Sequence, residues 1–287
     1  MSEEHTQIPR LPRWMKVPLP KGENYSRVKN ILHQQKLHTI CVSGNCPNKG
    51  ECWNAGTATF MILGDKCTRN CKFCQVYTQK PDPVDPEEPL RLAETIKELQ
   101  LKHAVITSVC RDELHDGGAG FWAACIRRVK ELNPATTLEV LIPDFRRGNN
   151  VVDLIISERP EVVSHNLETV KRLTPEVRSM ARYENSLALL AYIAQSGLVA
   201  KTGIMLGLGE TYVEVIETMH DARNAGAKVF TLGQYLRPSP AHYPVNEYIS
   251  PNVFAKLREE GLKMGFSYVE SGPQVRSSYH AELHVRA

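Results

Sequence analysis

The alternation of two hydrophobic patterns along the chain most restricts its fold. Short apolar runs typical of buried strands alternate with longer stretches whose apolar residues recur at helical spacing. We expect strands at 57–63, 104–109, 137–142, 162–165, 201–206 and 229–235, and helices at 86–101, 119–132, 150–157, 183–196, 211–224 and 251–261. About six strand–helix units predict an α/β fold with a parallel sheet, in the form of a partial barrel.

The segments outside this alternation have a different character. Residues 1–40 are rich in proline and lysine, which predicts an extended arm with one short helix at about 25–34. We therefore expect three parts: an N-terminal extension over residues 1–55, the barrel over 56–265 and a C-terminal tail over 266–287. The chain has 287 residues, a length that suits one large domain with extensions.

A three-cysteine motif follows the first expected strand. Cys67, Cys71 and Cys74 have the spacing C-x3-C-x2-C, with the aromatic Phe73 before the last cysteine. Three thiolates can hold a metal or an iron–sulfur cluster, and a [4Fe–4S] cluster normally takes four. A cluster held by three would keep one iron open to a small molecule. A zinc site and a helical packing face are the alternatives.

A second set precedes it. Cys41, Cys46 and Cys52 have the spacing C-x4-C-x5-C, and neighbouring glycine and proline residues predict a loop. This set again suggests a cluster short of one ligand, with zinc as the alternative. Six of the eight cysteines fall between Cys41 and Cys74, a clustering that favours metal ligation over disulfides. We expect the other two, Cys110 and Cys125, to be small packed residues.

Polar residues at the ends of the expected strands are candidates for binding a cofactor. Asp112, Gly117 and Gly118 follow the second strand, where glycines allow close approach of a ligand but also make simple turns. Asn166 and Glu168 follow the fourth strand and suit ribose hydroxyls or an amine, although Asn166 could instead cap a helix.

The last two strands add two candidates. Gly203 lies in a glycine-rich run that lacks the G-K-[ST] ending of a phosphate loop, so we exclude binding of nucleoside triphosphates. Arg237 ends the sixth strand with a cation that could meet a carboxylate.

The composition excludes several classes of partner. The formal net charge of +3 gives no dense basic surface for nucleic acid. The longest apolar run, residues 187–194, is far shorter than the roughly 20 residues needed to span a bilayer. The polar N-terminus resembles neither a secretory signal nor a transit peptide, so we expect a cytoplasmic protein.

The C-x3-C-x-(aromatic)-C motif resembles the signature of the radical S-adenosylmethionine (SAM) enzymes. Over nearly its full length the chain resembles one family among them, the lipoyl synthases. The resemblance rests on residues 37–41 (LHTIC), 46–48 (CPN), 56–64 (GTATFMILG), 164–169 (SHNLET), 233–238 (GQYLRP) and 276–279 (RSSY). It implies a partial (β/α)6 barrel of the TIM type.

The resemblance also implies the cofactors, which are two [4Fe–4S] clusters and SAM. Cys67, Cys71 and Cys74 match the ligands of the SAM cluster, whose fourth iron chelates SAM. Cys41, Cys46 and Cys52 match the ligands of an auxiliary cluster. A serine of RSSY matches its fourth ligand, for which we assign Ser278 ahead of Ser277. Because Ser278 and the three SAM-cluster cysteines would touch the reacting groups, they are our candidate catalytic residues.

The chain departs from the usual family pattern at several positions. Cys110 stands where the family usually has Asp, Asn70 and Lys72 flank Cys71 where Arg and Pro are usual, Gln75 stands where Asp is common, and Gln274 replaces Leu. These departures remove no matched cluster ligand, but they affect the SAM pocket and the partner surface.

The implied reaction inserts two sulfur atoms, at C6 and then C8, into an octanoyl chain on a lysine of a lipoyl carrier protein. SAM is cleaved to a 5′-deoxyadenosyl radical that removes hydrogen, and the auxiliary cluster supplies the sulfur. The implied carrier is the glycine-cleavage H protein or an E2 lipoyl domain, with a ferredoxin- or flavodoxin-type electron donor and an iron–sulfur carrier for cluster repair. We expect a monomer. The alternatives are a methylthiotransferase-like radical SAM enzyme and a zinc-stabilised scaffold without enzymatic activity.

Overall fold

The computed structural model describes residues 10–17, 21–55, 57–146, 148–178 and 180–286. Most of the arm expected at the N-terminus, residues 1–9 and 18–20, therefore lies outside the described residues, as does Gly56 at the start of the GTATFMILG run.

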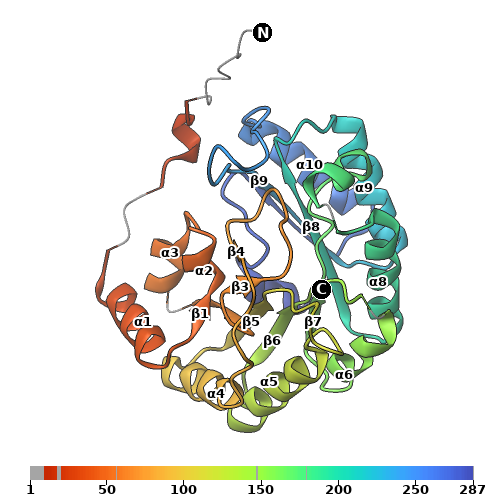
Figure 1. The fold of residues 1–287 in the computed structure, drawn as a ribbon. Coiled ribbons are helices and arrows are strands. Elements are labelled where there is room, and N and C mark those ends of the chain that lie inside the picture. Colours follow the sequence, from red (N-terminus) through yellow and green to blue (C-terminus); the bar gives the residue numbers. More distant parts are fainter. Residues whose placement is uncertain (1–9, 18–20, 56, 147, 179, 287) are drawn as a thin grey trace.

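A parallel sheet forms the centre of the molecule (Figure 1). Its order is β1-β2-β5-β6-β7-β8-β9-β10. The six expected strands are present and parallel, as β2 (Thr59–Ile62), β5 (His103–Ser108), β6 (Thr137–Leu141), β7 (Val162–Ser164), β8 (Val199–Leu206) and β9 (Val229–Gln234). The predicted partial barrel is confirmed.

The flanking segments add a strand at each edge of the sheet. The two-residue β1 (His38–Thr39) pairs antiparallel with β2, and β10 (Tyr268–Gly272) pairs parallel with β9. Neither strand was predicted, because β1 is too short to show a period and β10 runs directly into the Gly-Pro turn of the tail. Both predicted extensions thus contribute to the central sheet.

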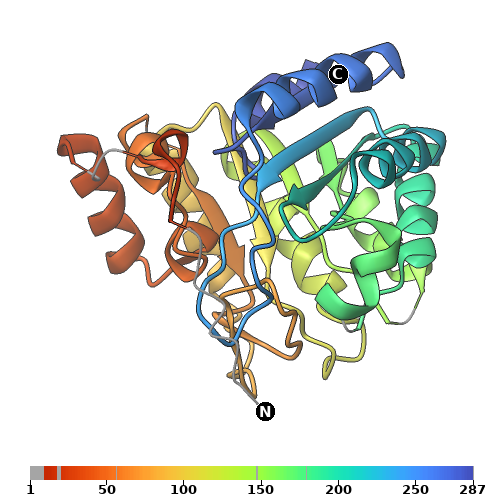
Figure 2. The ribbon, with the colours of Figure 1, turned by 90° about the horizontal axis from the view of Figure 1, so that it is seen from above.

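Helices cover the outside of the sheet. They are α4 (Glu88–Leu99), α5 (Ala119–Leu132), α6 (Asp153–Ile156) after the 3-10 turn η2 (Asn149–Val152), α8 (Tyr183–Gln195), α9 (Tyr212–Asn224) and α10 (Pro251–Lys263). The six helices expected from periodicity are therefore present. A short unpredicted pair, η3 (Lys171–Leu173) and α7 (Thr174–Val177), follows β7. Figure 2 shows the N-terminal helices on one flank of the sheet and α8 and α9 on the other.

The N-terminal extension folds into short helices beside β1 and β2. They are η1 (Arg13–Met15), the expected helix α1 (Glu23–Gln34), α2 (Ile40–Ser43) and α3 (Lys49–Asn54). The segment 41–52 was predicted to be a loop, but α2 and α3 occupy its two ends. Local capping explains α2, since the backbone N–H of Val42 donates to Thr39 Oγ1 over 3.3 Å.

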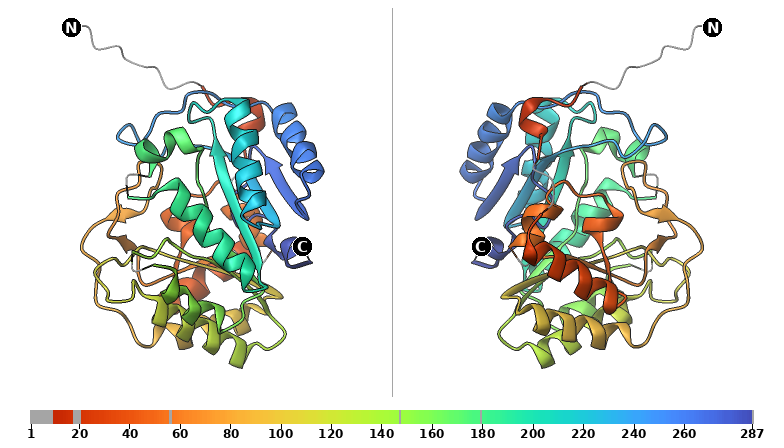
Figure 3. Two further views of the ribbon diagram at one scale, coloured as in Figure 1. Left: turned by 90° about the vertical axis from the view of Figure 1, so that its right-hand side faces the viewer. Right: turned by 90° about the vertical axis from the view of Figure 1, so that its left-hand side faces the viewer.

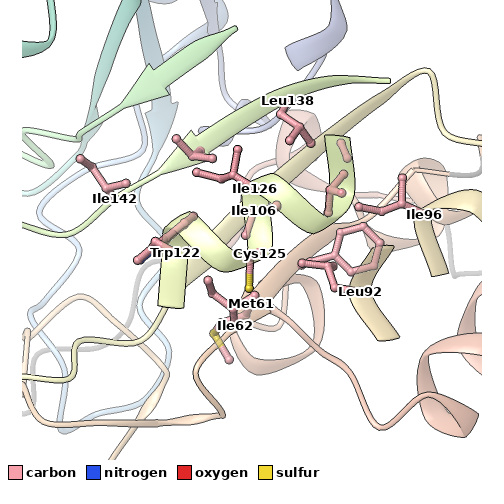
Figure 4. Close-up of a cluster of buried hydrophobic side chains, with 14 of the residues drawn as sticks. Met61, Ile62, Leu92, Ile96, Ile106, Trp122, Cys125, Ile126, Leu138 and Ile142 are labelled. Atoms are coloured by element: carbon pink, nitrogen blue, oxygen red, sulfur yellow. The ribbon is translucent and has the colours of Figure 1, made fainter. Parts of the chain in front are cut away.

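The core between the sheet and α4 and α5 is close-packed. Figure 4 shows Met61, Ile62 and Ile106 of the sheet meeting Leu92 and Ile96 of α4 and Trp122 and Ile126 of α5. Cys125 is fully buried among them, as predicted for a small packed residue. Such burial is the main favourable contribution to folding, at roughly 1.5–3 kcal/mol for each large apolar side chain.

The last described element, η4 (Ala281–Arg286), lies beside β10 (Figure 3). In the part of the chain that the structure describes, no helix is long and apolar enough to cross a membrane.

Candidate functional site

The loop that carries Cys67, Cys71 and Cys74 begins at the carboxyl end of β2. It is closed at its base by a two-stranded parallel ribbon, β3 (Lys66–Cys67) with β4 (Tyr77–Thr78). Its backbone is held by neighbouring segments, since Thr68 N–H donates to the Cys110 carbonyl (3.2 Å) and Lys72 N–H to that of Val177 (3.0 Å). The loop therefore takes its shape from β5 and α7 as well as from its own residues.

Arg69 anchors this loop from within. Its guanidinium donates to both carboxylate oxygens of Asp112, over 2.8 and 2.7 Å, and to the Asp144 carbonyl over 2.8 Å, and it also pairs with the Asp144 carboxylate. The Arg69 side chain is only 5% exposed. Burial disfavours the charged form of Arg69, but the attraction of the two carboxylates is larger, so the pKa of Arg69 is raised. The cation thus fixes the loop between Cys67 and Cys71 to the ends of β5 and β6.

The three thiols of the loop affect one another. Burial raises the pKa of Cys71 to about 11 and of Cys74 to about 12, and the neighbouring thiols of the set add to both shifts. The pKa of Cys67 falls to about 6 because Cys110 and the backbone N–H groups of Arg69 and Cys110 stabilise its thiolate, although burial opposes this. Mutual repulsion among buried thiolates is relieved by a bound cation, so the donor set fits an iron–sulfur cluster.

Asn166 and Glu168 lie at the carboxyl end of β7, beside this loop. Burial raises the pKa of Glu168, against the opposing effects of Arg178 and Asn166, and the carboxylate is close enough to Cys71 and Cys74 to raise their pKa. Glu168 has a φ of 66°, an uncommon conformation for a residue other than glycine. The structure therefore holds an acidic group next to the cysteine loop at some local cost.

Unpartnered polar atoms gather at the same edge of the sheet. Among the described residues, Ser108 Oγ at the end of β5 and Ser164 Oγ at the end of β7 are buried without a hydrogen-bond partner. So are Asn166 Oδ1 and Thr169 Oγ1. Buried polar groups are normally hydrogen-bonded, so these atoms fit a polar ligand such as SAM. Neither serine was predicted as a site residue, although each ends an observed strand and is the next-to-last residue of a predicted one.

Asp112 and Gly117 line a cavity of about 300 Å³, together with Arg69, Cys110, Arg111, Leu114, Asp116, Pro143, Asp144, Phe145 and Arg146. Gly118 does not line the cavity itself. A Cβ on Gly118 would lie 2.7 Å from Leu63 Cδ1, and one on Gly117 would lie 3.0 Å from Phe145 Cδ1. The Asp-Gly-Gly run therefore packs closely in a turn, and its role in binding a cofactor stays a prediction.

The remaining candidates have partners within the fold. A Cβ on Gly203 would lie 2.0 Å from Thr231 Oγ1, so this glycine lets β8 and β9 pack. Arg237 Nε donates to the His242 carbonyl over 2.9 Å, and His242 Nε2 lies 3.1 Å from the Cys74 carbonyl. Phe73 packs against the apolar core beneath α9 and α10, which includes Leu206 of β8, Leu232 of β9 and Phe254 of α10. The contacts of His242 and Phe73 hold the end of the cysteine loop against the rest of the barrel.

The second set of cysteines lies on α2, α3 and the turn between them. Burial raises the pKa of Cys41, and the Cys46 thiol raises it further against opposing contacts with Thr59 and Trp53. Burial raises the pKa of Cys52 to about 12, with additional contributions from Cys41 and Cys46. The three thiols are therefore neighbours, although 11 positions separate the first from the last.

Two polar groups next to Cys41 complete this second site. Trp53 Nε1 is buried beside the Cys41 thiol, so it could donate to a thiolate or to a cluster sulfur. Thr59 Oγ1 donates to Ser278 Oγ over 2.7 Å, and Thr59 also contacts Cys41. The structure thus brings Ser278 of the tail to the second set, 219 positions away from Thr59 in sequence.

Further contacts hold the tail against the N-terminal extension. Asn48 Nδ2 donates to the Gln274 carbonyl over 2.6 Å, and Tyr279 Oη donates to Glu51 over 3.2 Å. Arg276 lies close enough to Cys46 for their charges to interact. Ser277 Oγ instead accepts from Asn166 Nδ2 over 2.7 Å.

Within the described residues, no three His, Cys, Asp or Glu side chains converge in a way that could hold a single metal ion. Cluster ligands need not converge on one point, because each binds a different iron at a different corner of the cluster.

Two sequence models of known families match the chain. The radical SAM superfamily matches residues 61–222, and the N-terminal domain of lipoyl synthase of the radical SAM family matches residues 1–46. A lipoyl synthase of Bacteroides fragilis is 56% identical over 277 residues, covering 96% of each chain. One of Treponema denticola is 56% identical over 276 residues, covering 96% of this chain and 95% of the relative. A mitochondrial lipoyl synthase of Nematostella vectensis is 54% identical over 275 residues, covering 96% and 94%.

Solved structures are similar in fold at low identity. Methylornithine synthase (PylB) aligns with a TM-score of 0.58 at 13% identity, over 86% of this chain and 81% of that one. HydG, a maturase of the [FeFe]-hydrogenase, aligns with a TM-score of 0.53 at 13% identity, over 92% and 74%. This likeness supports the partial barrel and nothing finer.

Proposed function

The chain belongs to the lipoyl synthase family of radical SAM enzymes, and on that premise we propose how its residues divide the reaction. The family's enzymes insert two sulfur atoms, at C6 and C8, into an octanoyl chain on a lysine of a lipoyl carrier protein. The relatives support this function and neither alternative considered above, the methylthiotransferase or the zinc scaffold.

We propose that Cys67, Cys71 and Cys74 hold the SAM cluster. The mutual influence of the three thiols supports this assignment. Glu168 and Asn166 would receive the amino and ribose groups of SAM, with Ser108 and Ser164 as further polar contacts at the strand ends. When bound, the cluster and SAM supply a carbon radical that removes hydrogen from the octanoyl chain. Arg69 keeps the loop in place through Asp112 and Asp144.

We propose further that Cys41, Cys46 and Cys52, with Ser278, hold an auxiliary [4Fe–4S] cluster that supplies the sulfur. One observation carries this assignment: the hydroxyl of Ser278 lies 2.7 Å from Thr59 Oγ1, and Thr59 contacts Cys41. Iron in such clusters prefers soft thiolate, so a hard oxygen ligand should leave more readily than a fourth cysteine. A serine therefore suits a cluster that is consumed.

We propose an octanoylated carrier domain as the protein substrate, either the glycine-cleavage H protein or an E2 lipoyl domain. A ferredoxin- or flavodoxin-type protein would donate the electrons, and an iron–sulfur carrier would rebuild the cluster. Mass spectrometry of each octanoylated carrier after anaerobic incubation with reconstituted enzyme, SAM and reductant would identify the substrate. Sulfur gained by neither carrier would exclude both.

The test of the cluster assignment is Ser278→Ala in the same assay. We expect SAM cleavage to 5′-deoxyadenosine to continue while sulfur insertion falls at least about tenfold, as for loss of a group on which one step depends. Ser157→Ala, at the exposed end of α6, is the matched control.

Ser277→Ala tests the other assignment of the ligand. Loss of sulfur insertion in Ser277→Ala, with Ser278→Ala unaffected, would move the ligand to Ser277. Full sulfur insertion in both variants would refute a serine ligand altogether.

A further inference from the structure

A fully buried ionic group lies inside the barrel, away from the cysteine loops. Lys201 of β8 and Glu139 of β6 are both 0% exposed, and Lys201 Nζ lies 2.7 and 2.8 Å from the two carboxylate oxygens of Glu139. Each is the third residue of its strand, counted from the amino end. Because catalytic loops of parallel barrels lie at the carboxyl ends of the strands, this pair belongs to the floor of the barrel.

The C-terminal tail reaches into this group. His284 of η4 is 0% exposed, and its Nδ1 lies 2.9 Å from Lys201 Nζ. Its ring packs against that of Tyr268 on β10, with centroids 4.8 Å apart. An ammonium has three donors and no acceptor, so two go to Glu139 and the third to a neutral His284. The ring of His284 thereby completes the hydrogen bonding of a buried cation.

This contact anchors the chain downstream of the RSSY segment, in addition to the hydrogen bonds of Ser277 with Asn166 and of Tyr279 with Glu51. Upstream, residues 268–272 are fixed as β10 in the sheet, and downstream Ala281 and His284 are buried in the floor. Ser278 lies in the turn between them, where the described contact of its side chain is the single hydrogen bond from Thr59. A segment tied at both ends samples far fewer positions than one tied at one end.

We propose that His284 is a positioning residue: by anchoring η4 to Lys201 and Glu139, it holds the Ser278 hydroxyl against Thr59, beside the Cys41, Cys46 and Cys52 set. The effect of His284 on sulfur insertion rests on the proposed function of Ser278 as a cluster ligand. The anchoring itself rests only on the burial and contacts of η4.

Two substitutions at one position separate packing from hydrogen bonding. His284→Phe keeps a ring against Tyr268 but offers no acceptor to Lys201. His284→Asn loses the ring but offers Oδ1 near the position of Nδ1. His220→Phe, at an exposed site on α9, is the control for an added phenylalanine.

The first readout is amide hydrogen exchange over residues 273–286, measured in the full chain with and without reconstituted clusters. Losing a hydrogen bond to a charged group should raise local opening about tenfold or more, so we expect His284→Phe to raise exchange throughout 276–286 by that factor. His284→Asn should restore slow exchange, and His220→Phe should match the wild type.

The second readout is the number of sulfur atoms inserted for each SAM cleaved. We expect this ratio to fall in His284→Phe while SAM cleavage continues, and to recover in His284→Asn. Wild-type exchange at 276–280 in His284→Phe would overturn the proposal, as would faster exchange confined to 281–286 with an unchanged ratio. Failure of His284→Phe to fold by circular dichroism, or of His284→Asn to restore either readout, would also overturn it.

The two proposals fail in distinguishable ways. If Ser278→Ala inserts sulfur normally, the ligand function fails whatever His284 does, and the exchange measurement still decides whether His284 anchors the segment. If Ser278→Ala abolishes insertion while His284→Phe leaves both readouts unchanged, the ligand function stands and the positioning role is wrong.

Discussion

Replacing Arg69 with methionine removes the cation between two of the proposed cluster ligands while keeping an unbranched apolar stem. In the structure this guanidinium satisfies Asp112 through two hydrogen bonds, of 2.7 and 2.8 Å, and pairs with the carboxylate of Asp144. The substitution leaves the two carboxylates near each other, with Asp112 12% and Asp144 24% exposed. Arg146 Nε lies 3.4 Å from the Asp112 carboxylate, so Arg146 still compensates part of the charge of Asp112 in the variant.

The magnitude follows from the burial of the three groups. Removing one partner of a buried ion pair costs about 3–5 kcal/mol, because the remaining charge is left uncompensated. The partial exposure of Asp144 and the nearby Arg146 reduce this figure, so we expect a loss of about 3 kcal/mol in the free energy of unfolding. We also expect selective loss of the iron bound by the first cysteine set, since Arg69 lies inside its loop.

The assay is urea unfolding of the reduced, cluster-free protein, together with iron analysis after reconstitution. Arg146→Ala is the matched control, because Arg146 pairs with the same carboxylate but is 55% exposed, and it should cost under about 1 kcal/mol. Equal losses in the two variants, or a loss under about 1 kcal/mol for Arg69→Met, would refute the reasoning that burial sets the strength of this pair.

Two further predictions concern the scaffold. Burial raises the pKa of Glu88 to about 7 from its ordinary 4.5, although its carboxylate accepts the Leu63 N–H over 3.0 Å. The folded state then binds more protons than the unfolded state between these values, so stability falls as pH rises from 4.5 through 7, by at most about 3 kcal/mol. Glu88→Gln should therefore raise the melting temperature more at pH 8 than at pH 5, and an equal change at both pH values would contradict this. Gly203→Ala places a Cβ 2.0 Å from Thr231 Oγ1 and should cost about 3 kcal/mol in urea unfolding, whereas a wild-type midpoint would show that β8 and β9 can separate freely.

The regular part of the fold was predictable because local and global preferences agree there. The apolar run at 57–63 became β2, and the periodic segment 119–132 became α5 without a change of boundary. The failures include the shortest elements, whose few residues do not establish a periodic pattern. α2 and β1 together span only His38–Ser43, and they depend on a cap from Thr39 and on pairing with β2. Tertiary contacts specify such elements, and a pattern search cannot detect them.

The grouping of the cysteines in the candidate site could be predicted from the sequence, whereas most contacts of the residues around them could not. Thiol spacing is a local property, so Cys67, Cys71 and Cys74 could be grouped from sequence. The partner of Asp112 could not be predicted, because Arg69 lies 43 positions away in sequence. Its guanidinium hydrogen-bonds to the carboxylate of Asp112, which was predicted to bind a cofactor. Ser108 and Ser164 were overlooked because a serine at a strand end carries no distinctive pattern.

The two adjacent serines show where sequence reasoning reaches its limit. Ser277 and Ser278 have the same chemistry, and only the family resemblance separated them. In the structure the two hydroxyls face different partners: Ser277 accepts from Asn166 at the end of β7, and Ser278 from Thr59 beside Cys41. One turn of the tail therefore contacts both the candidate SAM pocket and the second cysteine set. A shift of this turn would disturb both sites at once, which is why an anchor such as His284 should affect sulfur insertion without being near the reacting atoms.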